Sequence, residues 1–218
     1  SATRPDAVLF DLDGTLVDTV PARIEAWLAT FVEFAIPAER ADVAPMIGID
    51  GRRLARDAAA ASGRMLDDAT AETIDRRAGE LFAALNTEPT PLPGARDLLQ
   101  RLVDDGVTWA IATSSRRDQT GSSVAALGLD REPRIVDGSH VEHAKPAPDL
   151  LLLAANELGV AAERCWYVGD STWDMRAAVA AGMRPMGVLA GAAVDAAALR
   201  DAGAVEELDA LDGLRLPD

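Results

Sequence analysis

The chain has 218 residues and contains 36 acidic against 21 basic residues, which gives a formal net charge of -15. This charge repels phosphate backbones and anionic lipid surfaces, so it argues against nucleic-acid and membrane binding. The sequence has one cysteine, Cys165, and no apolar run near the roughly 18 residues that a membrane-spanning helix needs. We therefore expect a cytoplasmic globular protein, present as a monomer or a weak homodimer.

The predicted core begins with short apolar runs that are typical of buried strands. In chain order, these runs are residues 7–10, 107–113, a weaker one at 134–136, 164–169 and 185–189. Helical patterns lie between them at residues 95–102, 150–158 and 175–181. Strands that alternate with helices indicate right-handed crossovers and a parallel sheet covered on both faces. The predicted fold class is α/β, with a Rossmann-like parallel sheet.

Residues 17–88 interrupt this alternation, because they show three helical stretches and no strand-like run. A proline-rich segment at residues 87–94 then returns the chain to the core. We predict an α/β catalytic core at residues 1–16 and 89–218 and an inserted helical cap domain at residues 17–88. We also expect this cap to move as a body over the core.

Polar residues follow three of the predicted strands. They are Asp11 and Asp13 after the first strand, Thr113 and Ser114 at the end of the second, and Asp170 and Asp174 after the strand that contains Cys165. In an open parallel sheet, ligands bind beyond the carboxyl ends of the strands, so these residues should meet at one edge. Four carboxylates would repel one another there without a cation, and their hard oxygen ligands suit Mg²⁺.

Lys145 is the only lysine of the chain, and the other 20 basic residues are arginines. Such a lysine either remains by chance or occupies a site where a compact ammonium cannot be exchanged for a wide guanidinium. Lys145 lies in a proline-bounded loop just before a predicted helix. Acidic residues, Mg²⁺ and a single lysine together predict a phosphoryl-transfer site.

The order of these motifs resembles that of a known family. The motifs are Asp11-x-Asp13-Gly-Thr-Leu, Thr113-Ser114, Lys145-Pro and Gly169-Asp170-x-x-x-Asp174. Together with the inserted helical segment, they make the whole chain similar to haloacid dehalogenase superfamily hydrolases with a helical C1-type cap. The most similar branch is that of phosphoglycolate phosphatase and β-phosphoglucomutase.

The resemblance implies a chemical role for three residues. Asp11 would be the nucleophile that forms an aspartyl-phosphate. Asp13 would be general acid and then general base, with its backbone carbonyl on Mg²⁺. Lys145 would neutralise charge on the phosphoryl group and on the nucleophile.

The resemblance also implies binding roles. The Thr113 hydroxyl and the Ser114 amide would bind the phosphate oxygens. We therefore expect Thr113 to act as a catalytic residue as well. Asp170 would bind Mg²⁺ together with Asp11 and Asp13, and Asp174 would support the metal or its waters. Two simpler interpretations stay open, because Thr113-Ser114 could cap a helix and Asp174 could be an acidic residue favoured by a helix dipole.

Single residues narrow the choice within the superfamily. Dehalogenases lack the second aspartate, which is present here as Asp13, and phosphonatases use a cap lysine, which is absent from residues 17–88. The leading prediction is a Mg²⁺-dependent phosphatase of the phosphoglycolate phosphatase type, acting on a small phosphorylated metabolite. A β-phosphoglucomutase-like mutase is second, because Arg23 stands where such mutases carry a histidine. A catalytically silent phosphate-binding relative is the third, although the residues that it would lack are present.

The predicted contacts to the rest of the substrate are arginines. Arg52 and Arg53 lie in the cap segment that should return over the site, and Arg116 and Arg117 follow the phosphate-binding loop. These side chains could bind a substrate carboxylate or a second phosphate, or they could be solvated.

Overall fold

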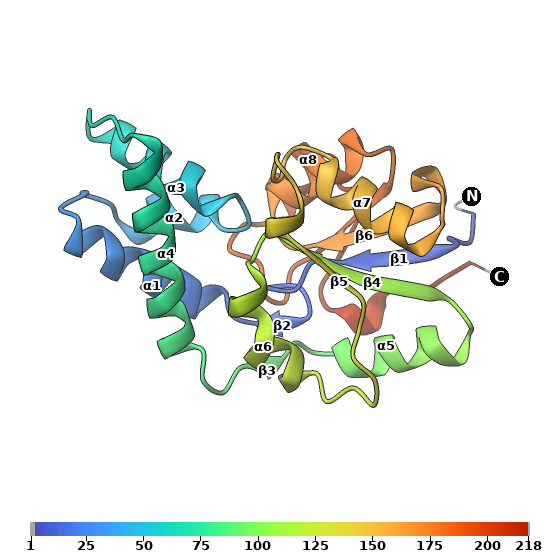
Figure 1. Cartoon of the computed structure of the whole chain (residues 1–218). Coiled ribbons are helices and arrows are strands. Elements are labelled where there is room, and N and C mark those ends of the chain that lie inside the picture. Colours follow the sequence, from blue (N-terminus) through green and yellow to red (C-terminus); the bar gives the residue numbers. More distant parts are fainter. Residues whose placement is uncertain (1–2, 218) are drawn as a thin grey trace.

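The computed structural model describes residues 3–217, apart from the side chain of residue 140, and contains one six-stranded sheet (Figure 1). The strand order is β5-β4-β1-β6-β7-β8, and every pairing is parallel. The bounds are β1 Ala7–Phe10, β4 Thr108–Thr113, β5 Ile135–Asp137, β6 Cys165–Gly169, β7 Arg184–Val188 and β8 Glu206–Leu208. The predicted α/β class with a parallel sheet is confirmed.

Helices cover both faces of this sheet. They are α5 Ala95–Asp104, α6 Arg117–Ala126, α7 Asp149–Leu158, α8 Thr172–Ala180 and α9 Ala196–Asp201. Along β1, Val8 and Phe10 pack in the apolar cluster that contains the buried leucines of α5, whereas Ala7 and Leu9 pack against α7 and α8. Because both faces of β1 are buried, its sequence is apolar throughout rather than alternating.

The helices α1 Val20–Glu33, α2 Arg40–Val43, α3 Gly51–Ala61 and α4 Asp68–Leu85 form a helical unit beside the sheet (Figure 1). The apolar faces of α1, α3 and α4 enclose a cluster of their own, which includes Trp27, Phe31, Leu54 and Ile74. None of the helices in residues 3–217 combines the length and the apolar character that a membrane crossing requires. The domain boundaries at residues 17 and 88 stay a prediction.

Two short strands connect the helical unit to the sheet. β2 Val17–Asp18 pairs antiparallel with β3 Thr90–Pro91, and the Leu92 amide donates to the Leu16 carbonyl at 2.9 Å. The prediction that residues 17–88 contain no strand is therefore wrong at Val17–Asp18, because a two-residue strand is too short to show a periodic pattern. The sequence patterns also missed β8, α6 and α9.

Short 3-10 helices complete the described chain. They are Ala44–Met46, Gly138–His140, Ala162–Arg164 and Leu211–Gly213. The first of them precedes the loop that leads to α3, and this loop lies over the carboxyl end of the sheet, where Ser114 donates to the Gly48 carbonyl at 3.0 Å.

Candidate active site

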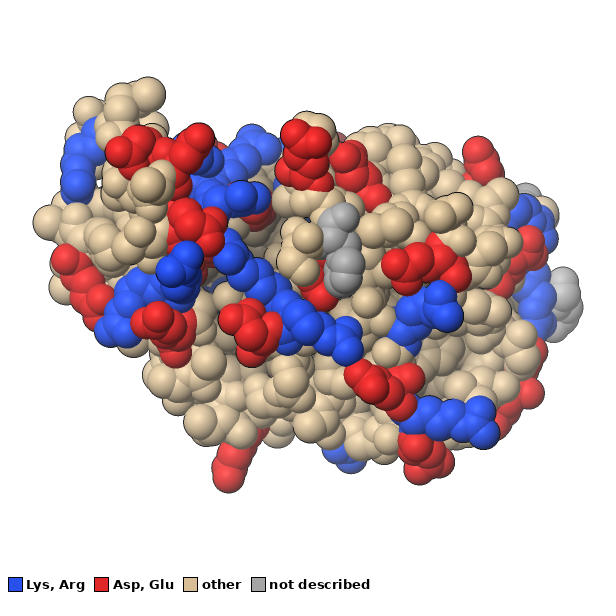
Figure 2. Space-filling model, viewed as in Figure 1, with Lys and Arg blue, Asp and Glu red and all other residues tan. Residues whose placement is uncertain are grey.

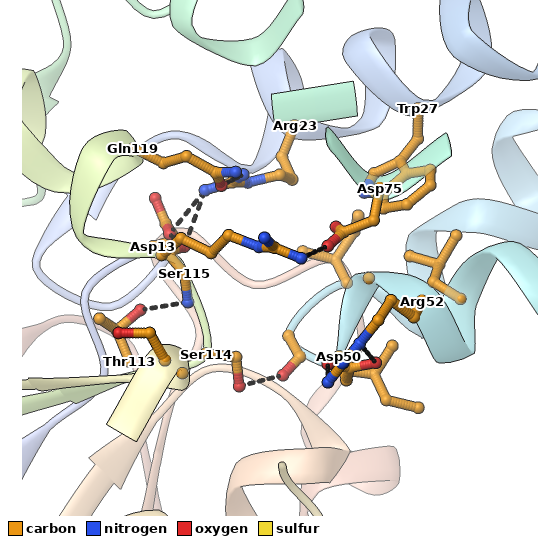
Figure 3. Close-up of a pocket in the computed structure, with 18 of the residues that line it drawn as sticks. Asp13, Arg23, Trp27, Asp50, Arg52, Asp75, Thr113, Ser114, Ser115 and Gln119 are labelled. Carbon is orange, nitrogen blue, oxygen red and sulfur yellow. Dashed lines mark hydrogen bonds and ion pairs between the residues drawn. The ribbon is translucent and has the colours of Figure 1, made fainter. Parts of the chain in front are cut away.

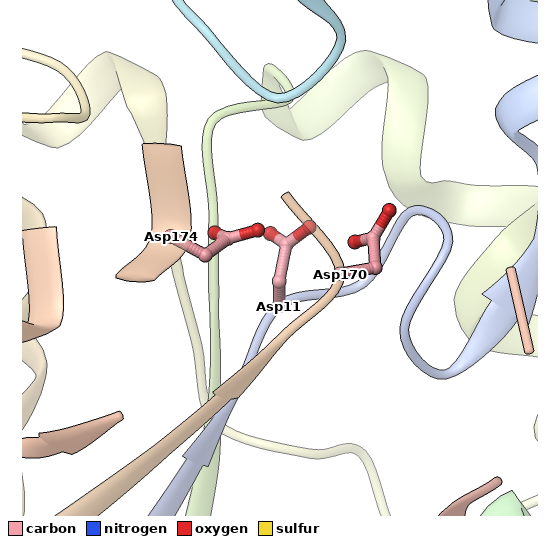
Figure 4. Close-up of side chains that lie close together, drawn as sticks. All are labelled: Asp11, Asp170 and Asp174. Atoms are coloured by element: carbon pink, nitrogen blue, oxygen red, sulfur yellow. The ribbon is translucent and has the colours of Figure 1, made fainter. Parts of the chain in front are cut away.

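Three buried carboxylates meet at the carboxyl end of the sheet. β1 and β6 pair with Phe10 beside Val168, so both strands end at the same edge. Asp11 follows β1, Asp170 follows β6, and Asp174 lies in the first turn of α8. Figure 4 shows the three side chains together, and one carboxylate oxygen from each lies within 4.8 Å of the others. The sequence prediction that these residues converge is matched by their positions.

Gly14 makes the close approach of Asp170 possible. Gly14 has a φ of 80°, and a Cβ atom at this position would lie 2.3 Å from Oδ2 of Asp170. A side chain would therefore both strain the backbone and displace the carboxylate. The next residue, Thr15, donates from Oγ1 to Oδ1 of Asp170 at 2.9 Å. The turn after β1 thus holds Asp170 in place.

Lys145 provides the positive charge next to these carboxylates. Its Nζ atom donates to Oδ1 of Asp11 at 2.8 Å and to Oδ1 of Asp174 at 2.7 Å, and its side chain is fully buried. Burial by itself lowers the pKa of Lys145, but Asp11 and Asp174 outweigh this effect and raise the pKa above its ordinary value. Lys145 is therefore a fixed ammonium in contact with Asp11.

Asp174 uses both carboxylate oxygens for contacts inside the protein. Oδ1 accepts from Lys145 and, at 3.1 Å, from the Tyr167 hydroxyl. Oδ2 accepts from the Ser171 amide at 3.0 Å and from the Ser171 hydroxyl at 2.6 Å. The Asp174 amide in turn donates to Ser171 Oγ at 3.2 Å, which completes the capping box of α8. Asp174 therefore serves both as an acidic residue of the first turn of α8 and as a site residue, because its Oδ1 atom orients Lys145.

The donor set fits a divalent cation. Burial raises the pKa of Asp170 well above its usual range, and the neighbouring Asp174 and Asp11 raise it further. Burial likewise raises the pKa of Asp11, against the opposing effect of Lys145. Among the described residues, one ammonium faces these three clustered acids, and buried oxygen donors of this kind suit a hard cation.

Asp13 is held by a network that includes the helical unit (Figure 3). Nη2 of Arg23, from α1, lies 2.9 Å from Oδ2 of Asp13, and Thr19 donates to Oδ1 at 2.7 Å. The Ser115 hydroxyl contacts the same Oδ2 atom. Burial raises the pKa of Asp13, but Arg23 and the two hydroxyl donors outweigh it, so the pKa is lowered. The Arg23 guanidinium also stacks 3.4 Å above the Phe82 ring.

The end of β4 lies beside these acids. Thr113 is the last residue of β4 and is buried, and its Oγ1 accepts from the Ser115 amide at 3.1 Å. Thr113 and Ser114 both line the same cavity as Asp11 and Asp13. The predicted phosphate-binding residues thus lie next to the predicted nucleophile.

The cavity lies between the sheet edge and the helical unit and has a volume of about 350 Å³. Arg52 and Arg116 line it, as predicted candidates for substrate contacts. Both arginines form ion pairs with carboxylates. Nη2 of Arg52 lies 3.0 Å from Oδ2 of Asp50, and Nη2 of Arg116 lies 2.6 Å from Oδ2 of Asp75.

Arg53 is outside the cavity lining within the described residues, so its placement does not support the predicted substrate contact. Neighbouring positions on a helix point about 100° apart, and Arg53 pairs with Asp57 at 3.4 Å, on the surface of α3. Arg117 also faces away and pairs with Glu132 at 2.9 Å.

Several cavity residues were missed by sequence reasoning. They are Trp27, Asp50, Glu72, Asp75, Ser115 and Gln119. Trp27 contributes to both the core of the helical unit and the cavity wall. The acids of α4 have no motif, so only their position in the folded chain shows that they face the site.

Comparison with known proteins is consistent with this geometry. The sequence profile of the family described as haloacid dehalogenase-like hydrolase matches residues 8–188, which is most of the chain. The chain belongs to this family. The resemblance seen in the motifs is thereby confirmed.

Relatives in this family include phosphatases. A phosphoglycolate phosphatase of Xanthomonas campestris is 34% identical over 190 residues, covering 86% of this chain and 84% of that protein. Hexitol phosphatase A of Escherichia coli is also 34% identical over 190 residues, covering 85% of this chain and 83% of that protein. The crystal structure of a hydrolase from Pseudomonas syringae superposes with a TM-score of 0.89 at 32% identity, covering 94% of this chain and 93% of that one.

Proposed function

We propose that this chain is a Mg²⁺-dependent phosphatase that hydrolyses a small phosphorylated metabolite through an aspartyl-phosphate on Asp11. The observation that carries the proposal is the buried contact of 2.8 Å between Lys145 Nζ and Asp11 Oδ1, with Asp170 beside it. Phosphoryl transfer needs a nucleophile and positive charge beside the phosphoryl group. Here these are a carboxylate, a fixed ammonium and carboxylate oxygens that can bind a divalent cation. The phosphatase relatives support the same reaction class.

In the first step, a carboxylate oxygen of Asp11 attacks the phosphorus atom of the ester. An oxygen–phosphorus bond forms, the bond from phosphorus to the substrate oxygen breaks, and Asp13 gives a proton to the departing oxygen. Asp13 must be protonated for this step, so substrate binding must weaken its contact with Arg23.

In the second step, water attacks the phosphorus atom and Asp13 accepts its proton. The bond between phosphorus and Asp11 breaks, which releases inorganic phosphate and restores the carboxylate. The contact with Arg23, at 2.9 Å, favours the charged form of Asp13 that acts as the base here.

The remaining residues hold the phosphoryl group. We assign its oxygens to the Thr113 hydroxyl, the Ser114 amide and the Lys145 ammonium. Asp11, Asp170 and the backbone carbonyl of Asp13 would hold Mg²⁺, which when bound neutralises charge on the phosphoryl group. Because both oxygens of Asp174 already accept hydrogen bonds, we assign it to the orientation of Lys145 rather than to direct metal binding.

The helical unit would act as the cap over this site. Arg23, Arg116 and Ser114 all bridge the unit and the core. Closure of such a cap would exclude bulk water from the phosphoryl group. We propose that residues 17–88 move about the β2–β3 pair as they open and close the cavity.

The test of this function is release of p-nitrophenol from p-nitrophenyl phosphate. We expect Mg²⁺-dependent hydrolysis that EDTA abolishes and added Mg²⁺ restores. Asp11→Asn should reduce kcat by at least about a thousandfold. A matched control is Asp6→Asn, since Asp6 is exposed and pairs with Arg164 at the surface. Hydrolysis that survives Asp11→Asn or EDTA would contradict the proposal.

A further inference from the structure

We infer that the part of the cavity beyond the phosphoryl site binds an uncharged, polyhydroxylated group, so that the preferred substrates are monophosphates of polyols or sugars. This inference rests on the proposed phosphatase function and names the substrate class for it. It is carried by how the charged side chains of the cavity are paired.

The arginines of the outer cavity are already bound to carboxylates. Nη2 of Arg116 lies 2.6 Å from Oδ2 of Asp75 and 3.0 Å from Glu72, and both acids come from α4. Nη2 of Arg52 lies 3.0 Å from Oδ2 of Asp50. An anionic group on the substrate would therefore meet arginines whose positive charge is already shared with carboxylates.

The third arginine of the cavity lies closer to the nucleophile. Arg23 donates from Nη2 to Asp13 at 2.9 Å and from Nη1 to Oε1 of Gln119 at 2.9 Å. Its guanidinium is held from below by the Phe82 ring. Arg23 thus lies beside the proposed acid–base residue, and Gln119 and Phe82 still hold it there when its contact with Asp13 weakens.

The charges of the outer cavity sum to a negative value. Two arginines, Arg52 and Arg116, face the three carboxylates of Asp50, Glu72 and Asp75 among the described lining residues. A substrate carboxylate or second phosphate would lie within a few ångströms of like charges in a partly enclosed space, where repulsion is stronger than in water. Figure 2 shows basic side chains gathered beside the hollow of this face, with acidic side chains next to them.

The same groups match hydroxyls. A hydroxyl group can donate a hydrogen bond to a carboxylate and accept one from a neighbouring guanidinium without breaking their ion pair. Figure 3 shows Asp75 and Trp27 on the same side of the cavity, with Arg52 and Asp50 next to each other below them. Trp27 also lines the cavity, although only 4% of its surface is exposed, so it adds a small apolar area to the wall.

Sequence identity does not decide between the two substrate types. The phosphoglycolate phosphatase and the hexitol phosphatase named above are equally similar to this chain, at 34% identity each. The first of these names refers to a phosphate ester that also carries a carboxylate. The second refers to a phosphate ester of an uncharged polyol. The ion pairs of Arg52 and Arg116 favour the second type.

The first experiment compares three phosphate esters with the whole enzyme in Mg²⁺. They are sorbitol 6-phosphate, 2-phosphoglycolate and phosphoethanolamine, which carry a neutral, an anionic and a cationic group, and p-nitrophenyl phosphate reports general activity. We expect kcat/KM for sorbitol 6-phosphate to exceed that for each of the others by at least about tenfold. A higher value for 2-phosphoglycolate or phosphoethanolamine, with p-nitrophenyl phosphate hydrolysed, would overturn the inference and leave the phosphatase proposal standing.

A second measurement does not depend on turnover. Binding of sorbitol 6-phosphate and 2-phosphoglycolate to the Asp11→Asn protein with Mg²⁺ is measured by calorimetry. Tighter binding of sorbitol 6-phosphate supports the inference even if no ester is hydrolysed. A lack of hydrolysis would by itself contradict only the phosphatase proposal. Equal binding, no binding, or tighter binding of 2-phosphoglycolate would overturn the inference.

A variant tests the cause of the preference. Asp75→Asn removes one negative charge and the shortest contact of Arg116, so the ratio of kcat/KM for 2-phosphoglycolate to that for sorbitol 6-phosphate should rise by about tenfold. Glu33→Gln is the matched control, because Glu33 pairs with Arg77 at 2.7 Å on the outer side of the helical unit. Its ratio should equal that of the parent.

The partly exposed Glu72 gives a second variant in case Asp75→Asn does not fold. Glu72→Gln weakens the same arginine contact, and a smaller shift of the ratio in the same direction is expected. Unchanged ratios in every variant that folds would show that the ion pairs do not set the preference and would overturn the argument.

Discussion

Nζ of Lys145 lies 2.8 Å from Oδ1 of Asp11, and both side chains are buried at the carboxyl end of the sheet. The same Nζ atom lies 2.7 Å from Oδ1 of Asp174, so the ammonium is held between two carboxylates. This arrangement leaves little room for a larger cation. It gives a structural reason for the single lysine in a chain whose other 20 basic residues are arginines.

Lys145→Arg should be nearly as damaging as Lys145→Ala. A guanidinium is broader than an ammonium, so it should push Asp11 or the phosphoryl group out of line, and a shift of about 1 Å can cost roughly a hundredfold in rate. Both variants should also melt at a lower temperature, because Lys145 is fully buried. The measurement is kcat/KM per folded molecule, with the melting temperature followed alongside. Retention by the arginine variant of more than about a third of the parental value would contradict this account.

Asp170→Asn and Asp174→Asn should have different effects. Among the described residues, Asp170 accepts a hydrogen bond from Thr15 on Oδ1, whereas both oxygens of Asp174 accept hydrogen bonds, from Lys145, Tyr167 and Ser171. We expect Asp170→Asn to raise the Mg²⁺ concentration for half-maximal activity by about tenfold or more, and Asp174→Asn to lower kcat with a smaller change in that concentration. A Mg²⁺ titration of both variants checks this. The reverse pattern would make Asp174 the metal ligand.

The core and the order of its motifs could be predicted from the sequence because both follow from local patterns. Strands buried on both faces are continuous apolar runs, and parallel strands bring the residues that follow them to one edge. Asp11, Thr113 and Asp170 could therefore be placed together without coordinates. β2 and β8 were missed because they are two and three residues long and lack the apolar run that marked β5.

The outer cavity could not be predicted in the same way. Asp75 lies on a helix whose other face packs in the helical unit, and only the meeting of α4 with the β4–α6 segment places it opposite Arg116. The contact of Arg23 with Asp13 depends likewise on how α1 lies over the sheet edge. The resemblance marked Arg23 as the position where related mutases carry a histidine, but did not show its partner.

Arg116 should hold the helical unit against the core. Arg116→Gln removes its contacts with Asp75 and Glu72, so the loop at residues 47–50 should exchange its amide hydrogens roughly fivefold faster. The neighbouring Arg117→Gln is the matched control, because Arg117 pairs with Glu132 away from the cavity. Hydrogen–deuterium exchange followed by mass spectrometry measures both. Equal exchange in the two variants would rule out this role for Arg116.

Cys165 should be unreactive in the folded protein. It is fully buried in β6, and burial, with smaller contributions from Asp6 and Glu163, raises the pKa of its thiol to about 11. At about pH 8 almost no thiolate is present, so a disulfide reagent should label the thiol only after unfolding in guanidinium chloride. The absorbance of the released reagent anion gives the number of labelled thiols per chain. Rapid labelling of the native protein would show that β6 opens readily.

The central claim, that Asp11 carries the phosphoryl group, is tested most directly by trapping the intermediate. p-Nitrophenolate needs no proton to depart, so Asp13→Asn should still form the aspartyl-phosphate from p-nitrophenyl phosphate and should hydrolyse it slowly. After acid quenching, peptide mass spectrometry should find one phosphoryl group on Asp11 of Asp13→Asn and none on the protein that also carries Asp11→Asn. A phosphoryl group on another residue, or p-nitrophenol release by Asp13→Asn with unmodified Asp11, would contradict the account.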